Sequence, residues 1–510
     1  MNRLDIVKIG VTAFGLVLAF PPFTTGLIAF LVLVPLFSII EFKPFRTVLA
    51  AGFVTGLIWG AGTFYWIGWA TVLGVTGTVL AFALYWMLFT GLLQLLVRKW
   101  GRRAFWTAPL LWTGYEMLIG SGPLAFPWNS LAYTQSYSSA AIQFISHTGS
   151  YGLTFWIVLV NVLLYFLSRQ PVRTKAFRAL AATAVLIFIL PWLYGWRTLH
   201  SETLASRPIR ISLIQGNIDP YKKWTPAFVD SNFTLYQDLT RRAGQADPDL
   251  IVWPETAAPS YLRRQIQYLR PVKRLVDSLN TPILTGSLDY HWIDAKNVKT
   301  YNAAFLVRPT GWHLDKYYKM RLVPFSERVP LMETVPFLYE FSKKFTLDVG
   351  SFTAGDSVHV FSIPSKSLDR DMHFGTLICY DSVFPQLGRD FVRRGAEFLV
   401  IITNDGWFGP TSGPYQHARI AVFRAIENRV WIARCANTGI SECIDPFGRI
   451  VNKTRLDETA VLTESIGLPQ KQTFYVRHGQ TYPAVVWSTC GLVLAAGILP
   501  FRRRRPVRTD

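Results

Sequence analysis

The sequence has few cysteines and none of the spacings that bind metals. Only four of its 510 residues are cysteine: Cys379, Cys435, Cys443 and Cys490. None of them forms a CxxC pair, which argues against a zinc or iron–sulfur site, and we predict neither a metal nor another cofactor. We expect Cys435 and Cys443 to be two buried thiols, with a bridge between them as the alternative if this region lies outside the cytoplasm.

Charged residues are also scarce. They make up 16% of the chain, against 50% hydrophobic residues, and the stretch 47–97 contains no Asp, Glu, Lys or Arg. A soluble domain rarely tolerates such a stretch, so the composition indicates a membrane protein. The net charge of +20 would suit nucleic-acid binding. The basic residues cluster beside apolar runs, however, and we therefore predict no nucleic-acid partner.

Apolar runs predict an N-terminal membrane domain over residues 1–200. Seven candidate spans lie at 9–20, 23–40, two within 47–97, 104–119, 153–168 and 179–196. The first run is short for a helix that must cross about 30 Å of hydrocarbon. A last run, 482–501, predicts a C-terminal transmembrane helix.

Basic residues follow alternate spans. They are Lys43 and Arg46, four residues within 98–103, four within 169–178, and 502–505. The positive-inside rule places these loops and the N-terminus in the cytoplasm, and the chain between the seventh and the last span outside. The aromatic segment 120–152 has no Lys or Arg and falls on the outer side. We expect it to be interfacial, with a wall of a lipid access path as the alternative.

From residue 208 the pattern changes to alternating strands and helices. Strand-like runs lie at 209–218, 249–254, 282–286, 303–308, 374–380 and 398–403, and helix-like segments at 260–278, 384–395 and 414–430. Thr225 and Pro226 are typical of a helix start. This alternation predicts an α/β domain over 205–475. Residues 470–481 would lead back to the membrane.

Three reactive side chains stand at the ends of strand-like runs. Cys379 lies in HFGTLICYDSVFP (373–385), Glu255 in LIVWPETAAP (250–259) and Lys319 in YYKMRLVPFSERVP (317–330). A thiol attacks as the thiolate, so it requires a base and a polar setting. We assign Cys379 as nucleophile, Glu255 as general base and Lys319 as the cation that stabilises thiolate and oxyanion. Each residue alone is better explained as packing or surface; the assignment depends on the three together.

The residues around these three resemble the carbon–nitrogen hydrolase (nitrilase) superfamily, through WPET, YxKxxLVPFxE and CYD. The whole chain resembles the bacterial apolipoprotein N-acyltransferases, with further matches at QGNI (215–218), TNDGWFG (403–409) and RCANTGIS (434–441). This resemblance implies a multi-span α-helical membrane domain joined to a nitrilase-like α-β-β-α sandwich.

The resemblance also implies an acyl transfer. A membrane phospholipid would give an acyl chain to Cys379, and the thioester would pass it to the α-amino group of the N-terminal diacylglyceryl-cysteine of an apolipoprotein. The expected partners are therefore a phospholipid donor, a diacylated apolipoprotein acceptor and membrane lipids. The expected location is the bacterial inner membrane, as a multi-pass protein whose catalytic domain faces the periplasm.

Several residues are expected to support the site. Glu327 would orient Lys319 or the incoming amine, or form a structural salt bridge, and the backbone N–H of Tyr380 is a candidate oxyanion donor. Asp381 stands where many relatives have glutamate, which keeps the charge and shortens the reach. The remaining candidates are Asn302 as a support carried over from the resemblance, and Trp224, Trp407, Phe408 and the stretch 331–345 as walls or a lid.

Two other functions remain open on the sequence alone. A membrane-anchored amidase would use the same triad with water as acceptor, and would release ammonia from small amides. A transporter or scaffold would only bind, and would keep its activity in Cys379→Ala. Against transport, the predicted spans carry few ionisable residues, Glu116 being the main one.

Overall fold

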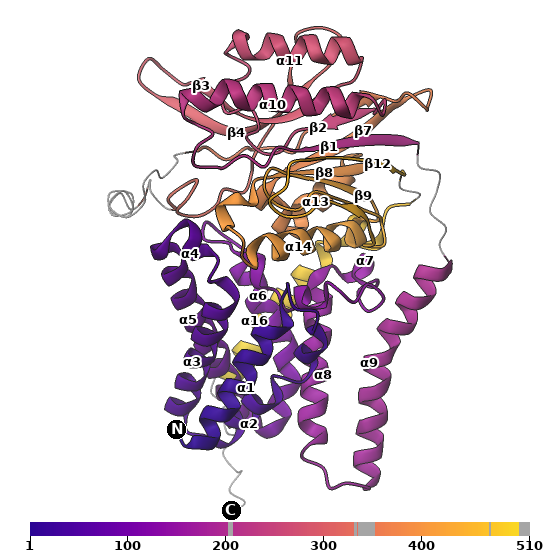
Figure 1. The fold of residues 1–510 in the computed structure, drawn as a ribbon. Coiled ribbons are helices and arrows are strands. Elements are labelled where there is room, and N and C mark those ends of the chain that lie inside the picture. The colour runs from indigo at the N-terminus through magenta and orange to yellow at the C-terminus, as the bar shows by residue number, and fades with distance from the viewer. Residues whose placement is uncertain (202–207, 331–333, 335–351, 469–470, 499–510) are drawn as a thin grey trace, which may run out of the picture.

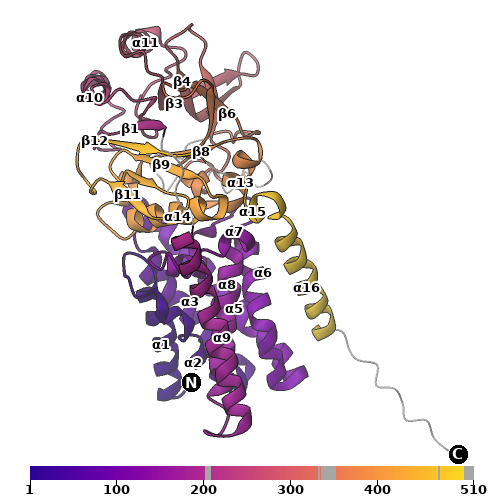
Figure 2. The ribbon, with the colours of Figure 1, turned by 90° about the vertical axis from the view of Figure 1, so that its right-hand side faces the viewer.

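The computed structural model describes residues 1–201, 208–330, 334, 352–468 and 471–498. Two parts are stacked along one axis: a bundle of helices, and above it an α/β domain (Figure 1). The last helix, α16, runs back alongside the bundle (Figure 2). The chain thus leaves the bundle once and returns to it, as the sequence predicts.

The apolar runs form the helices of the bundle. These are α1 (Arg3–Ala19), α2 (Val34–Phe42), α3 (Phe45–Phe64), α4 (Ile67–Ala70), α5 (Val72–Trp100), α6 (Ala108–Ile119), α7 (Ile145–Thr148), α8 (Ser150–Leu167), α9 (Lys175–Ser201) and α16 (Thr481–Ile498). The charge-free stretch folds as the expected pair, α3 and α5. Among the described residues, four helical stretches are long and apolar enough to cross a membrane: 45–64, 72–119, 150–167 and 175–201. The apolar helices at 26–42 and 481–497 are shorter, so the count of spans stays a prediction.

Three of the four predicted basic clusters lie at one end of the bundle, and the fourth, 502–505, lies outside the described residues. Glu41 pairs with Arg102 at 2.6 Å and with Arg169 at 3.7 Å, and Lys43 pairs with Asp5 at 3.0 Å. The α8–α9 turn and the N-terminus lie at this end, away from the α/β domain (Figure 1). The convergence fits a single charged face of the bundle, as the positive-inside pattern requires.

Segment 120–152 is a packed layer between the two parts. Glu116 of α6 accepts hydrogen bonds from Ser130 Oγ at 2.7 Å, Leu131 N at 2.8 Å and Thr154 Oγ1 at 2.8 Å. On its other side the segment contacts the α/β domain, where Gln143 Nε2 donates to the Phe447 carbonyl at 2.9 Å. Most of its side chains from residue 125 onward are buried. The segment thus joins the domains, a role that the sequence did not indicate.

The α/β domain contains two six-stranded sheets. The first has the order β12-β1-β2-β3-β4-β5 and the second the order β11-β10-β9-β8-β7-β6. The strands are β1 (Ile209–Gln215), β2 (Leu250–Val252), β3 (Ile283–Trp292), β4 (Val298–Val307), β5 (Asp315–Tyr318), β6 (Val360–Pro364), β7 (Asp371–Ile378), β8 (Phe398–Thr403), β9 (Trp431–Ala436), β10 (Glu442–Ile444), β11 (Ile450–Lys453) and β12 (Ala460–Ile466). The sequence predicts strands near β1–β4, β7 and β8 and a strand-like run before Lys319, which is β5; it does not indicate β6 or β9–β12.

Helices cover the outer face of each sheet. They are α10 (Pro226–Gly244) and α11 (Ile266–Leu279) over the first sheet, and α13 (Pro385–Arg393) and α14 (Gly413–Asn428) over the second, on the side of the bundle (Figure 1). A short helix, α15 (Phe474–His478), precedes α16. The arrangement confirms the α-β-β-α sandwich. Helix α10 begins at Pro226, as predicted.

The two sheets pack face to face through apolar side chains. The Sγ of Cys435, on β9, lies 3.3 Å from the carbonyl oxygens of Ile214 and Val252 in the first sheet. All four cysteines are free and buried, so the expectation of two separate thiols at 435 and 443 is confirmed.

Candidate active site

Cys379 stands at a sharp turn where strand β7 ends. Its φ of +49° is in the left-handed region, which is uncommon for residues other than glycine, and the short 3₁₀ helix η5 (Cys379–Val383) follows at once. A hydrogen bond within η5 stabilises this turn, because Ser382 Oγ donates to the Cys379 carbonyl at 2.7 Å. Backbone held in such a conformation by its surroundings is often found at functional sites.

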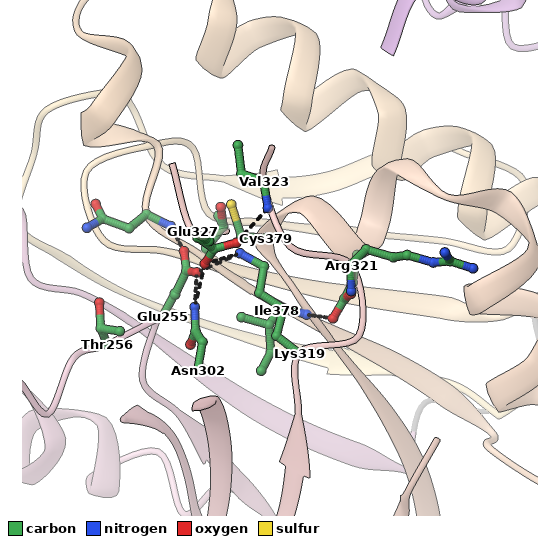
Figure 3. A network of polar contacts seen from close by, with 12 residues as sticks. Glu255, Thr256, Asn302, Lys319, Arg321, Val323, Glu327, Ile378 and Cys379 are labelled. Carbon is green, nitrogen blue, oxygen red and sulfur yellow. Dashed lines mark hydrogen bonds and ion pairs between the residues drawn. The ribbon is translucent and has the colours of Figure 1, made fainter. Parts of the chain in front are cut away.

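Four polar residues of the first sheet gather next to this cysteine. We call Glu255, Asn302, Lys319 and Glu327 the carboxylate–lysine cluster. Lys319 Nζ lies 2.8 Å from Glu327 Oε1 and 3.3 Å from Glu255 Oε1. Asn302 Nδ2 donates to the same two oxygens, at 3.1 and 2.8 Å. The Cys379 sulfur lies beside this cluster (Figure 3). The structure therefore brings the three predicted catalytic residues and two predicted supports together.

The positions of the residues in the carboxylate–lysine cluster are set by the strands of the first sheet and by one glycine. Glu255 follows β2, Asn302 lies on β4 and Lys319 follows β5, where Lys319 N donates to the Asn302 carbonyl at 2.9 Å. A Cβ on Gly286 of β3 would lie 2.7 Å from the Glu255 Cα, so only glycine permits this close approach. Asn404 N, from the second sheet, donates to Glu255 Oε2 at 3.0 Å. Backbone from both sheets thus fixes the carboxylate of Glu255.

Burial and the neighbouring charges determine the resting protonation. Burial raises the pKa of the Cys379 thiol, and the nearby Glu255 carboxylate raises it further, while Lys319 opposes them. Burial alone would lower the pKa of Lys319, but Glu255 and Glu327 together hold it well above its usual value. The resting site therefore contains a neutral thiol and a charged ammonium. The thiol proton must leave when a substrate arrives, and Glu255 is the carboxylate that can take it.

A second polar cluster lies behind the cysteine, on the second sheet. We call Ser382, Asp405, His417 and Arg434 the scaffold cluster. His417 Nε2 lies 2.9 Å from Ser382 Oγ and 3.3 Å from the Cys379 carbonyl, and His417 Nδ1 lies 2.8 Å from Asp405 Oδ1. Arg434 Nη2 donates to Asp405 Oδ2 at 2.7 Å. Although burial would raise it, Arg434 and His417 hold the pKa of Asp405 well below its usual range.

The scaffold cluster was missed by the sequence analysis. Asp405 and Arg434 lie within the motifs TNDGWFG and RCANTGIS, which could have singled them out. His417 had no such signal, because one histidine on a helix is usually a packing residue. The cluster touches the backbone of Cys379 through its carbonyl, so it can fix the turn and does not reach the sulfur through any described hydrogen bond.

Asp381 ties the turn to the segment that follows Lys319. Its carboxylate accepts hydrogen bonds from Arg321 N at 2.7 Å, Tyr317 OH at 2.9 Å and Ile378 N at 3.1 Å. Burial raises its pKa to about 6 despite these donors and the Lys319 charge. Two backbone N–H groups and one tyrosine hydroxyl donate to this carboxylate, so it connects the turn at Cys379 to β5 and to the segment after Lys319.

Tyr380 and an aromatic group connect the site to the bundle. Tyr380 OH donates to the Ala125 carbonyl at 2.8 Å, and its ring stacks on Trp128 with centroids 6.5 Å apart. Phe408 packs on both Trp128 and Trp66. The predicted wall residue Phe408 therefore faces the membrane domain.

Gln416 of α14 is the polar centre of this contact. Its Oε1 accepts from the indole N–H groups of Trp66 and Trp128 at 3.1 and 3.0 Å. Its Nε2 donates to the carbonyls of Pro21 and Thr63, both at 3.2 Å. One amide thus joins the catalytic domain to three segments of the bundle.

The other predicted walls are not placed at the triad. Trp224 is 40% exposed and its ring lies under Lys223, and Trp407 packs on Tyr221. The contacts described for these two tryptophans include no triad residue. The predicted lid, 331–345, lies outside the described residues except for Thr334.

Comparisons with known proteins agree with this architecture. Residues 210–474 match the carbon-nitrogen hydrolase family, and residues 12–163 match the apolipoprotein N-acyltransferase N-terminal domain. An apolipoprotein N-acyltransferase of Geobacter metallireducens is 35% identical over 98% of this chain and 96% of its own, and one of Chlorobaculum tepidum is 31% identical over 92% of each. Among solved structures, an amidase from Nesterenkonia sp. is 19% identical and matches 56% of this chain and 99% of its own, with a TM-score of 0.39. The chain belongs to the apolipoprotein N-acyltransferase family.

Proposed function

We propose that this protein transfers an acyl chain from a membrane phospholipid to the α-amino group of the N-terminal diacylglyceryl-cysteine of apolipoproteins. The observation that supports this most is the gathering of Glu255, Lys319 and Cys379 in one buried site, on a domain that rests directly on apolar helices. An enzyme that forms a thioester next to the membrane is well located to act on substrates that are themselves lipids. Family membership supports the same reaction.

In the first half-reaction Cys379 attacks the ester carbonyl of the phospholipid. Glu255 takes the thiol proton as the S–C bond forms, and the Lys319 ammonium stabilises the oxyanion, with the Tyr380 N–H as the second predicted donor. The C–O bond then breaks, Glu255 returns the proton to the leaving oxygen, and a lysophospholipid departs. The enzyme keeps the acyl chain as a thioester on Cys379.

In the second half-reaction the amine of the acceptor attacks this thioester. Glu255 accepts a proton from the attacking nitrogen, the C–S bond breaks, and the proton returns to the Cys379 sulfur. Glu327 accepts a hydrogen bond from Lys319 and from Val323 N at 2.9 Å, so we assign it to holding the ammonium toward the oxyanion. The product is an amide, and the free thiol is restored.

The same proposal assigns the domains and the topology. Residues 1–200 and 482–501 form the membrane part of a multi-pass protein, and residues 205–475 form the catalytic domain. The convergence of the basic loops at the far end of the bundle supports a cytoplasmic position for that end. The catalytic domain then faces the periplasm, with the protein in the bacterial inner membrane.

A lipopeptide assay tests the proposal. Purified protein is incubated with a phospholipid and a diacylated lipopeptide, and the product is measured by mass spectrometry for wild type and Cys379→Ala. We expect N-acylated lipopeptide from the wild type alone, with an acyl adduct on Cys379 when the lipopeptide is left out. Release of ammonia from small amides without lipopeptide acylation would identify an amidase instead. Equal N-acylation by Cys379→Ala would mean that Cys379 is not the nucleophile, and the absence of both products from the wild type would leave only a binding role.

A further inference from the structure

A hollow of about 320 Å³ lies between the bundle and the catalytic domain, close to the active site. One wall comes from the segment 122–125, which precedes the buried layer between the domains. The opposite wall comes from 320–328, the segment that follows Lys319, and Phe384 closes one side. The segment 320–328 directly follows Lys319 in the chain, and Ala125 of the segment 122–125 contacts Tyr380, the residue after Cys379.

The charged groups that line this hollow are of one sign. Among the described residues that line it, Arg321 and Arg328 are basic and none is acidic. Arg328 Nη1 donates to the Phe352 carbonyl at 2.9 Å. The guanidinium of Arg321 lies over the ring of Phe384, with its carbon 5.1 Å from the ring centroid. Arg321 is therefore the lining residue that offers a cationic donor to whatever occupies the hollow.

Arg321 has a side-chain donor without an acceptor. Its Nε is buried and has no hydrogen-bond partner, and among the described residues no carboxylate pairs with its guanidinium. The side chain points away from the carboxylate–lysine cluster (Figure 3). A buried guanidinium donor without an acceptor costs free energy, and a planar guanidinium suits phosphate oxygens. The arrangement indicates that an anion belongs in the hollow.

A backbone hydrogen bond of Arg321 fixes its position relative to Cys379. Arg321 N donates to Asp381, two residues after Cys379, and Phe384 follows directly after η5. On the other wall, the Ala125 carbonyl accepts from Tyr380 OH. An anion in the hollow and an acyl group on Cys379 can therefore belong to one lipid molecule.

We propose that this hollow binds the phosphate of the acyl donor, with Arg321 as its principal contact. The inference rests on the proposed function and adds to it the site that recognises the donor. The acceptor suits the hollow less well, because its reacting end carries an amine that the Arg321 guanidinium repels. Met320, Leu322 and Pro123 supply apolar surface for the glycerol part of the donor.

The test compares two acyl donors of the same chain length. One is a phospholipid, and the other is a p-nitrophenyl ester, which carries no phosphate. The measured quantity is the rate at which the thioester forms on Cys379 in the full-length protein. In Arg321→Gln we expect the rate with phospholipid to fall roughly ten- to a hundredfold, and the rate with the ester to change less than twofold.

Two further variants make the test specific. Arg321→Lys keeps the positive charge and loses the planar guanidinium, so it should retain part of the rate with phospholipid. It also replaces Arg321→Gln in the test if that variant does not fold. Arg274→Gln makes the same charge change on α11, an exposed position on the far side of the domain, and should match wild type. Inorganic phosphate should have little effect on the rate at which the wild type reacts with the p-nitrophenyl ester. It should inhibit the reaction of the wild type with phospholipid, and this inhibition should be absent in Arg321→Gln.

The outcomes separate the two levels of the proposal. If both Arg321 variants use phospholipid as fast as wild type, or lose both donors equally, the hollow is not the phosphate site. If wild-type protein forms no thioester with any phospholipid but reacts with the ester, the proposed function itself is wrong. A loss confined to the phospholipid supports the inference.

Discussion

The two polar clusters around Cys379 differ in what they touch. The carboxylate–lysine cluster belongs to the first sheet and places two carboxylates around one ammonium beside the sulfur. The scaffold cluster belongs to the second sheet and reaches the same residue through its backbone carbonyl. In the second cluster the charge of Asp405 is matched by Arg434. One sheet therefore supplies charge for the chemistry, and the other fixes the geometry of the nucleophile.

This difference predicts two kinds of variant. Changes in the carboxylate–lysine cluster remove interactions that grow in the transition state, so they should lower the rate of both half-reactions strongly. Changes in the scaffold cluster alter where the sulfur stands, so they should lower the rate less and reduce stability as well. Four experiments follow, and the first changes Cys379, the residue that both clusters surround.

Cys379→Ser should reduce acyl transfer by at least about a thousandfold, because a serine hydroxyl in this setting is a far weaker nucleophile than a thiol. The acyl adduct on residue 379 should be lost or trapped, as judged by mass spectrometry of the intact protein. Cys443→Ser alters another buried thiol of the same sheet and should keep the adduct. An unchanged adduct in Cys379→Ser would remove this residue as the nucleophile.

Lys319→Met should lower the rate of thioester formation roughly a hundred- to a thousandfold, because the oxyanion loses its charged donor. Single-turnover kinetics with phospholipid measure the effect. Lys316→Met, three residues earlier on β5, is the matched control. A loss of less than threefold in Lys319→Met would mean that the oxyanion is held elsewhere.

His417→Ala should lower kcat roughly tenfold and leave KM for the phospholipid nearly unchanged, because the binding surfaces stay intact while the turn at Cys379 loosens. His417→Gln can still donate to the Cys379 carbonyl and should recover part of kcat. The split between kcat and KM, measured with lipopeptide at saturation, distinguishes positioning from general destabilisation. Equal rates in all three proteins would show that the scaffold cluster is only structural.

Asp381 gives a smaller, pH-dependent effect on stability. Burial raises its pKa from 3.8 to about 6, so the folded protein binds this proton more tightly than the unfolded chain does. The contribution of the group is therefore most favourable below pH 3.8, and it declines by about 3 kcal/mol as the pH rises to 6 and above.

Asp381→Asn should remove this pH dependence. Thermal unfolding between pH 4 and pH 7 should show the wild type losing stability relative to the variant as the pH rises. Asp371→Asn, an exposed acid at the start of β7, the strand that precedes η5, should follow the wild-type profile. Parallel profiles for wild type and Asp381→Asn would contradict the buried, strained state of this carboxylate.

The sequence predicted the carboxylate–lysine cluster better than the scaffold cluster, and the reason is physical. Glu255 and Lys319 follow strands of the first sheet and Cys379 follows a strand of the second, and each of these strand-like runs can be recognised in the local sequence. The scaffold cluster depends on a helix residue, His417, and on contacts that only the packed domain creates. The hydrogen bond from Asn404 N to Glu255 comes from backbone, which no side-chain pattern can show.

The fold shows the same division between local and distant information. The charge-free stretch predicts α3 and α5 by composition alone. Strand β12 was missed, because it pairs with β1 through partners such as Ile209 and Ile466, which lie far apart in the chain. The docking of segment 120–152 was missed as well, since its aromatic residues suit an interfacial belt equally well.

The amide of Gln416 has a consequence for the substrates. By binding Trp66, Trp128, Pro21 and Thr63 at once, it holds the catalytic domain at a constant height over the helices. Under the proposed function, the sulfur therefore stays at one distance from the bilayer, and the ester of the phospholipid has to reach it there. The thickness of the surrounding bilayer therefore becomes a variable of the reaction, and thinner membranes should present their esters at a different depth from thicker ones.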